Sequence, residues 1–304
     1  MNKFLLLCAC LIGMCTSATA CDICGCSSGA SYLGTLPQLN RSFIGLRYNQ
    51  RSYVVSHAPL STGAETPPQN EHYRSVDVMG RYFVTRRIQV LALVPYNIYQ
   101  RTGSEGNLTS HGLGDVSLLA GYVILNTGDS IMHRFKHTLI ANGGAKLPTG
   151  RYKIANDDGR INPATQPGTG SFDGLINLFY TLRYRKFGIN IDGNARFCSQ
   201  NSMGYQPGNR YGATARLFMW QRLGWNWSVL PSVGATYDYA NIDTQHGIRQ
   251  SESGGRGLFG TIGADVYYKN AALGAYYQHP LAYHYSGGLA KPINRFTVQL
   301  LITF

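Results

Sequence analysis

From residue 42 to the C-terminus, the sequence alternates apolar and polar side chains in segments of about 12 residues. In the last segment, Phe296, Leu300 and Phe304 share one face, and Arg295 and Gln299 share the other. A period of two is typical of a β-strand whose two faces meet different surroundings. The pattern predicts about twelve strands, at residues 42–55, 72–85, 88–100, 114–125, 135–147, 170–184, 187–199, 209–222, 226–240, 254–268, 271–283 and 292–304.

The length of these strands and the spacing of the turns favour a transmembrane barrel over a soluble β-sandwich. Strands in soluble proteins usually have about 5 or 6 residues, roughly half the length expected here. Tight turns, as at 86–87, 185–186 and 269–270, alternate with long polar connections, at 56–71, 101–113, 148–169, 241–253 and 284–291. Outer-membrane barrels have this asymmetry between short periplasmic turns and long external loops.

The composition agrees with an outer surface that faces lipid. Charged residues make up only 14% of the chain, while Gly (36) and Tyr (21) are abundant. In hydrocarbon, each unpaired backbone N–H or C=O costs several kcal/mol, so a sheet that spans a membrane must close on itself. We therefore predict an all-β fold, a transmembrane antiparallel up-and-down β-barrel of about twelve strands in the bacterial outer membrane.

The N-terminus has the features of a secretory signal peptide. Lys3 precedes an apolar stretch that ends at Cys15, and the pattern Ala18-Thr19-Ala20 matches a cleavage site. The expected organisation is a signal peptide at 1–20, a cysteine-rich plug or periplasmic cap at 21–41, and the barrel at 42–304. Without Lys3 the net charge falls from +12 to +11. The basic residues are dispersed, which argues against nucleic acid and favours contact with lipopolysaccharide or a polar pore.

Cys21, Cys24 and Cys26 form a C-x-x-C-x-C motif at the start of the mature chain. Three thiolates this close together suit Cu(I) or Zn(II). Two other interpretations stay open. The oxidising periplasm favours disulfides, and Cys198 brings the mature cysteines to an even count of four. Alternatively, Cys21 carries a lipid.

The polar faces of the strands would line the interior of the barrel. The charged residues expected there are Arg47, Arg51, Asp77, Arg81, Asp115, Lys146, Asp173, Arg183, Asp192, Arg196, Arg216, Asp238, Asp265 and Arg295. Because an isolated buried charge is strongly disfavoured, charges of both signs would pair. Two interpretations follow: a salt-bridged, partly filled interior that braces the barrel, or a polar conduit for a small solute. Twelve strands predict a narrow or plugged pore.

Two stretches resemble motifs of the phenol-degradation meta-pathway family of outer-membrane proteins: residues 112–117 (GLGDVS) and 146–150 (KLPTG). This resemblance implies a transport-type barrel for small, often hydrophobic compounds. The N-terminal stretch at 21–29 (CDICGCSSG) is similar to a group of bacterial barrel proteins associated with copper and haem handling. The terminal Phe304 resembles the C-terminal signature that outer-membrane barrels present to their assembly machinery, which is therefore an expected partner.

The sequence contains no G-x-S-x-G elbow, no H-E-x-x-H motif and no glycine-rich phosphate loop, so we expect no enzymatic activity. The predicted function is an outer-membrane channel or transporter for a small solute or a metal complex, copper included. The C-x-x-C-x-C motif would serve as a metal-binding or plug element. Two alternatives stay open: a structural or adhesive closed barrel with its cysteines in disulfides, and a barrel that hydrolyses lipid.

Overall fold

The structure is a computed structural model that describes residues 41–56, 67–103, 107–127, 134–155, 159 and 161–304. The predicted signal peptide and the cysteine-rich segment, except Arg41, lie outside the described residues. The same holds for the expected metal ligands Cys21, Cys24 and Cys26.

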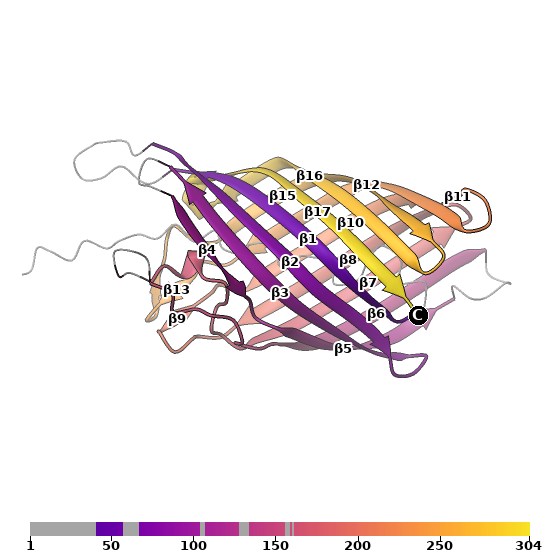
Figure 1. Ribbon diagram of the computed structural model, residues 1–304, viewed down its shortest axis with the longest axis horizontal. Coiled ribbons are helices and arrows are strands. Elements are labelled where there is room, and N and C mark those ends of the chain that lie inside the picture. The colour runs from indigo at the N-terminus through magenta and orange to yellow at the C-terminus, as the bar shows by residue number, and fades with distance from the viewer. Residues whose placement is uncertain (1–40, 57–66, 104–106, 128–133, 156–158, 160) are drawn as a thin grey trace, which may run out of the picture.

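Within the described residues, the chain forms a closed antiparallel barrel of twelve strands, as the alternating pattern predicted (Figure 1). Its strand segments are β1 (Phe43–Val55), β2 (Gln69–Phe83), β3 (Ile88–Thr102), β4 (Leu108–Leu113), β5 (Ser117–Asn126), β6 (Phe135–Lys146), β7 (Asp173–Tyr184), β8 (Phe187–Cys198), β10 (Arg210–Met219), β11 (Gln221–Arg222), β12 (Trp227–Ala240), β15 (Gly255–Tyr268), β16 (Ala271–Tyr285) and β17 (Ala290–Thr303). β4 and β5 form one interrupted strand, as do β10 and β11, so the fourteen segments count as twelve strands. Pairing of β1 with β17, from Phe43↔Thr303 to Val55↔Ala290, closes the ring.

The connections differ from the prediction at three places. The loop expected at 284–291 is only the turn 286–289, because β16 and β17 continue until Tyr285 pairs with Ala290. The loop expected at 101–113 shrinks to 103–107, because β4 pairs with β3. The strand expected at 114–125 is broken at 114–116, between β4 and β5. A small sheet of β9 (Tyr205–Gln206), β13 (Thr244–Gln245) and β14 (Ile248–Arg249) was not predicted.

Alternation along each strand separates an apolar outer face from a polar inner face. On β1, the outward side chains of Ile44 and Leu46 are 55% and 51% exposed, whereas Arg47, at an inner position, is 4% exposed. On β17, Leu300 and Ile302 are each 46% exposed. An apolar outer surface of this kind suits a hydrocarbon environment, as in outer-membrane barrels. Among the described residues, no helix is long and apolar enough to cross a membrane.

The interior of the barrel is packed in separate apolar clusters. One cluster, from β1, β12, β15, β16 and β17, contains Tyr53, Val55, Ala240, Phe259, Tyr285 and Ala290. A second lies between β3, β5, β6 and β7 and contains Leu91, Leu119, Val123, Ile140, Leu175 and Phe179. Burial of these side chains away from water stabilises the fold and occupies part of the lumen.

Candidate functional site

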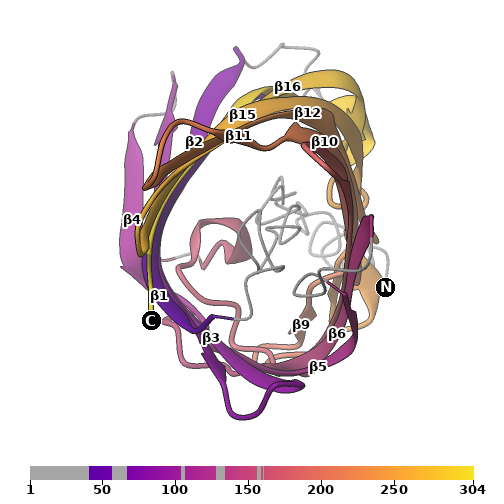
Figure 2. The same ribbon diagram turned by 90° about the vertical axis from the view of Figure 1, so that its right-hand side faces the viewer.

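The described parts of the connection between β6 and β7 (147–155, 159 and 161–172) fold inward and lie within the ring of strands (Figure 2). The short 3₁₀ helix η1 (Pro163–Thr165) has Asn162 as its N-cap, and the side chain of Asn162 accepts a hydrogen bond from the amide of Ala164. Asn97 on β3 donates to the carbonyl of Pro167 at 2.6 Å. This contact holds the middle of the connection against the inner wall of the barrel.

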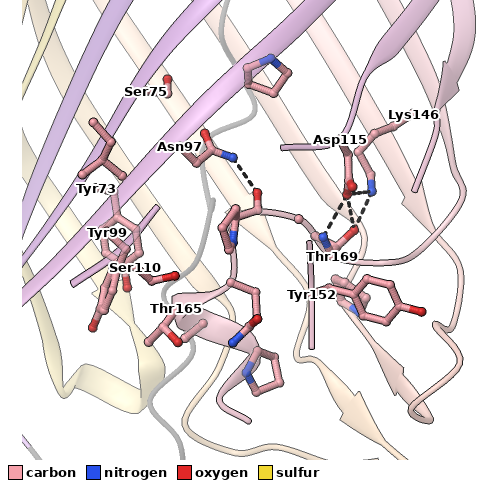
Figure 3. A pocket seen from close by; sticks show the side chains of 18 of the residues that line it. Tyr73, Ser75, Asn97, Tyr99, Ser110, Asp115, Lys146, Tyr152, Thr165 and Thr169 are labelled. Atoms are coloured by element: carbon pink, nitrogen blue, oxygen red, sulfur yellow. Dashed lines mark hydrogen bonds and ion pairs between the residues drawn. The ribbon is translucent and has the colours of Figure 1, made fainter. Parts of the chain in front are cut away.

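A cavity of about 250 Å³ lies between this connection and the inner wall. Strands β1 to β8 and β10 form most of its wall, and residues 161–169 and 201–207 cover it. One side is apolar and aromatic, with Tyr73, Tyr99, Leu93 and Pro95 (Figure 3). The rings of Tyr73 and Tyr99 lie 4.9 Å apart between their centroids. The cavity therefore combines an apolar side with charged groups.

Asp115 connects the inward loop to the barrel wall. One carboxylate oxygen, Oδ1, accepts a hydrogen bond from the backbone amide of Gly150 at 3.0 Å. The other, Oδ2, accepts from the amide of Thr169 at 2.9 Å and from Nζ of Lys146 at 2.5 Å (Figure 3). We call Asp115, Lys146, Gly150 and Thr169 the anchor cluster. A carboxylate that accepts backbone amides at both ends of a loop fixes the position of that loop.

Hydrogen bonds and an ion pair compensate the buried carboxylate of Asp115. Nζ of Lys146 lies against Oδ2 of Asp115, and Oγ1 of Thr169 donates to the same oxygen at 2.7 Å. Because a buried charge is strongly disfavoured unless it is paired and hydrogen-bonded, these contacts allow Asp115 and Lys146 to lie in the interior.

A second carboxylate extends the anchor cluster along the wall. Nζ of Lys146 lies 3.2 Å from Oδ2 of Asp173, and Oδ2 of Asp173 also binds Arg196 at 2.6 Å. Asn201 donates to the carbonyl of Thr169 at 2.8 Å. The positive and negative groups alternate, so each buried charge has an opposite neighbour.

Close contact between glycines allows the loop to fit against the wall. A Cβ atom added to Gly168 would lie 2.6 Å from the Cα of Gly150, and one added to Gly150 would lie 2.8 Å from the carbonyl carbon of Gly114. Nearby, the amide of Val116 donates to Oγ1 of Thr149 at 2.9 Å. The two stretches that resemble the phenol-degradation family, at 112–117 and 146–150, thus contact each other in the folded chain.

Seven of the fourteen charged residues expected in the lumen belong to this region. Six of them line the cavity: Arg47, Arg51, Asp77, Asp115, Lys146 and Arg196. The seventh, Asp173, binds Lys146 and Arg196. Nε of Arg47 donates to Asp77 at 2.9 Å, and Asn49 donates to the same carboxylate oxygen at 2.8 Å.

The other seven do not line the cavity: Arg81, Arg183, Asp192, Arg216, Asp238, Asp265 and Arg295. Arg295 pairs with Asp238 and stacks on the ring of Phe259, 3.6 Å from its centroid. Asp265 accepts a hydrogen bond from the hydroxyl of Tyr276 at 2.5 Å.

The remaining members of this group contact amides or aromatic rings. Asp192 accepts hydrogen bonds from Asn177 and Asn194. The guanidinium groups of the arginines lie over rings, Arg216 over Tyr276, Arg81 over Phe43 and Arg183 over Trp220. These contacts fill the interior and brace the wall.

Sequence reasoning missed several residues of the cavity. Arg210 has the same parity on its strand as Arg216, so alternation alone could have identified it. Tyr152, Thr169, Asn201 and Tyr205 lie in connections or in the short strand β9, where the sequence has no period to read. Their positions depend on contacts with residues that are distant in the sequence.

No group of three or more His, Cys, Asp or Glu side chains in the described part of the chain could hold a metal ion. Cys198 is buried at the end of β8 and forms no disulfide with any residue that the structure describes. The expected metal ligands Cys21, Cys24 and Cys26 lie outside the described residues, so the metal prediction stays a prediction.

Comparison with known proteins identifies the fold. No protein-family model matches the chain, and no curated protein sequence does. Among solved structures, an outer membrane channel from Pseudomonas putida F1 is similar at a TM-score of 0.65 and 17% identity, covering 87% of this chain and 96% of that one. The β-domain of the Bordetella autotransporter BrkA is similar at a TM-score of 0.54 and 13% identity, covering 87% and 100%. The barrel is thus of the type found in bacterial outer membranes.

Proposed function

We infer that this chain is an outer-membrane channel that passes a small solute through the cavity between the β6–β7 connection and the barrel wall. The observation that carries the proposal is the cavity itself, which lies inside a closed barrel and is covered by an inward-folded loop. The similar barrel from Pseudomonas putida F1 is an outer membrane channel, which supports the proposal.

The size of the cavity limits the solute. Pockets that hold typical small-molecule ligands have volumes of about 300–1,000 Å³. The cavity of about 250 Å³ lies just below this range. We therefore expect passage of solutes smaller than a typical ligand, and exclusion of oligosaccharides and peptides.

Planar-bilayer recording of the full mature chain tests this function. We expect discrete conductance steps, and liposomes that contain the protein should swell faster in glycerol than in a disaccharide. Liposomes with a heat-denatured sample of the same protein are the control. Absence of both conductance and swelling would overturn the channel.

The metal part of the proposal depends on the sequence alone. We include a metal complex, copper in particular, among the candidate solutes, with Cys21, Cys24 and Cys26 as a metal-binding or plug element. Copper and zinc binding should be lost in the Cys21/Cys24/Cys26→Ser triple variant, while Cys198→Ser should keep it. Equally poor binding by the wild type and the triple variant would contradict this part.

A structural barrel is the second candidate, and one observation favours it. The ion pair between Arg295 and Asp238 and the cluster around Tyr53 and Phe259 brace one side of the interior. A heat-resistant barrel without conductance would support this candidate. Barrel hydrolase activity, the alternative from the sequence, would require turnover of phospholipid or ester substrates, which we do not expect.

A further inference from the structure

Two pairs of arginines lie directly opposite each other on neighbouring strands of the barrel. Arg51 on β1 is opposite Arg295 on β17, and Arg196 on β8 is opposite Arg210 on β10. Like charges in directly opposite positions destabilise a sheet. Each pair therefore needs counter-charges, and these must come from other strands or from a bound ion.

Carboxylates of the chain satisfy one member of each pair. Asp238 binds Arg295, and Asp173 binds Arg196. Arg51, which is partly exposed and lines the cavity, makes no hydrogen bond or ion pair with any residue that the structure describes. A guanidinium inside a barrel without such a partner can donate hydrogen bonds to an anion from solution.

The side chains that line the cavity carry an excess of positive charge. Among the lining side chains that point inward by alternation, the basic ones are Arg47, Arg51, Lys146, Arg196 and Arg210, and the acidic ones are Asp77 and Asp115. Arg74 also borders the cavity, but it lies on the outward-facing positions of β2 and binds Gln100. Even when Asp173 is added to the acidic side, basic groups remain in excess.

The two acidic side chains that line the cavity are already fully engaged. Asp77 accepts from Arg47 and Asn49, and Asp115 holds the anchor cluster together. A cation that enters the cavity would have to break these contacts to reach a carboxylate. An anion would reach Arg51 without breaking any contact of the described residues.

The positions of the arginines place positive charge on opposite walls. β1 and β8 are six strands apart in the ring of twelve, so Arg51 and Arg196 face each other across the lumen. Tyr73, Tyr99 and Leu93 form the apolar side of the same cavity. A molecule with an anionic head and an apolar body would satisfy both surfaces.

We propose that this cavity binds small monocarboxylates with an apolar body, the carboxylate on Arg51 and the body against the tyrosines. The proposal rests on the channel function argued above and names the substrate class of that site. Arg51 acts as the binding group, and the excess of basic side chains makes the path selective for anions.

The test uses the full mature chain in planar bilayers under a KCl gradient, followed by sodium butyrate. We expect a reversal potential that shows chloride to be more permeant than potassium. Butyrate should reduce the chloride current more than acetate does, because its longer body contacts the apolar side. Arg51→Gln should lower the anion-to-cation permeability ratio about tenfold, because removal of one unit charge a few ångströms away in water changes the energies of the anion and of the cation by similar amounts in opposite directions.

Two variants serve as controls. Arg51→Lys keeps the charge and should keep anion preference, and Arg222→Gln removes an exposed charge on β11 and should change nothing. Absence of both wild-type conductance and liposome swelling would overturn the channel function. A conducting barrel that prefers potassium, or in which Arg51→Gln behaves as wild type, would overturn the anion site alone. Should Arg51→Gln fail to fold, the reversal potential of the wild type and the effect of butyrate still decide whether the cavity binds anions.

Discussion

Replacement of Asp115 by asparagine should release the β6–β7 connection from the barrel wall. Asparagine keeps the size of the side chain but turns one acceptor oxygen into a donating NH₂ group. That group would face the amide of Gly150, or else the amide of Thr169 together with Lys146. The substitution also removes the charge, and the carboxylate of Asp173, at 3.2 Å, is then the charged partner of Lys146, which also donates to Thr169 and Ser171.

The contacts of Asp115 set the size of the effect. A hydrogen bond to a charged group contributes about 1.5–3 kcal/mol. Lys146 keeps the carboxylate of Asp173, so no buried charge is left uncompensated, and we take about 1.5–3 kcal/mol for the anchor. Since about 1.4 kcal/mol is a factor of ten, the ratio of released to anchored connection should rise about tenfold to a hundredfold.

Limited proteolysis and single-channel recording of the full chain measure this change. Asp115→Asn should be cut faster within residues 147–172 and should show larger or more frequent conductance steps, while the barrel itself stays folded. Asp192→Asn is the matched control, because Asp192 accepts hydrogen bonds from Asn177 and Asn194 on the barrel strands. If Asp115→Asn is cut no faster and conducts no more than this control, the anchoring role of Asp115 is wrong.

Two further predictions concern the same interior. Gly168→Ala should cost about 1–3 kcal/mol and loosen the connection to proteases, because its Cβ would lie 2.6 Å from Gly150, whereas Gly143→Ala, with nothing within 4 Å, should not. Arg295→Gln leaves a carboxylate buried without its cation and should lower the free energy of unfolding in urea by about 3–5 kcal/mol, and an unchanged unfolding midpoint would refute the bracing role.

The strands could be predicted because lipid and lumen impose opposite demands on alternate side chains. On β17, Arg295 and Gln299 are buried and Leu300 and Ile302 are exposed to the surroundings, as the period of two requires. The strand expected at 271–283 occupies Ala271–Tyr285, a difference of two residues at one end. Strand ends are less certain than strand faces, because the alternating demand weakens where the chain leaves the lipid.

The inward connection could not be predicted, because its position depends on contacts between distant parts of the chain. The hydrogen bond from Thr169 to Asp115 joins residues 54 positions apart, and no periodic pattern marks Thr169. Asp115 and Lys146 were expected to face the lumen from alternation, but nothing in the sequence indicates that they bind one another. Thr169 and Asn201 lie in irregular segments, where propensity alone does not determine conformation.

The two interpretations of the interior charges, bracing and conduction, apply to different sides of the same barrel. On the side of β12 to β17, Arg295 is stacked on Phe259, and Tyr285 is fully buried, so that half is a packed core. On the side of β1 to β8, a second apolar cluster fills part of the interior, but a cavity remains, and a loop that Asp115, Asn97 and Asn201 hold covers it. Bracing alone would call for filling on both sides, since an unfilled space loses packing contacts. A rigid half beside a covered cavity is instead the arrangement a narrow, selective channel needs, because the fixed wall sets the width while the loop limits passage.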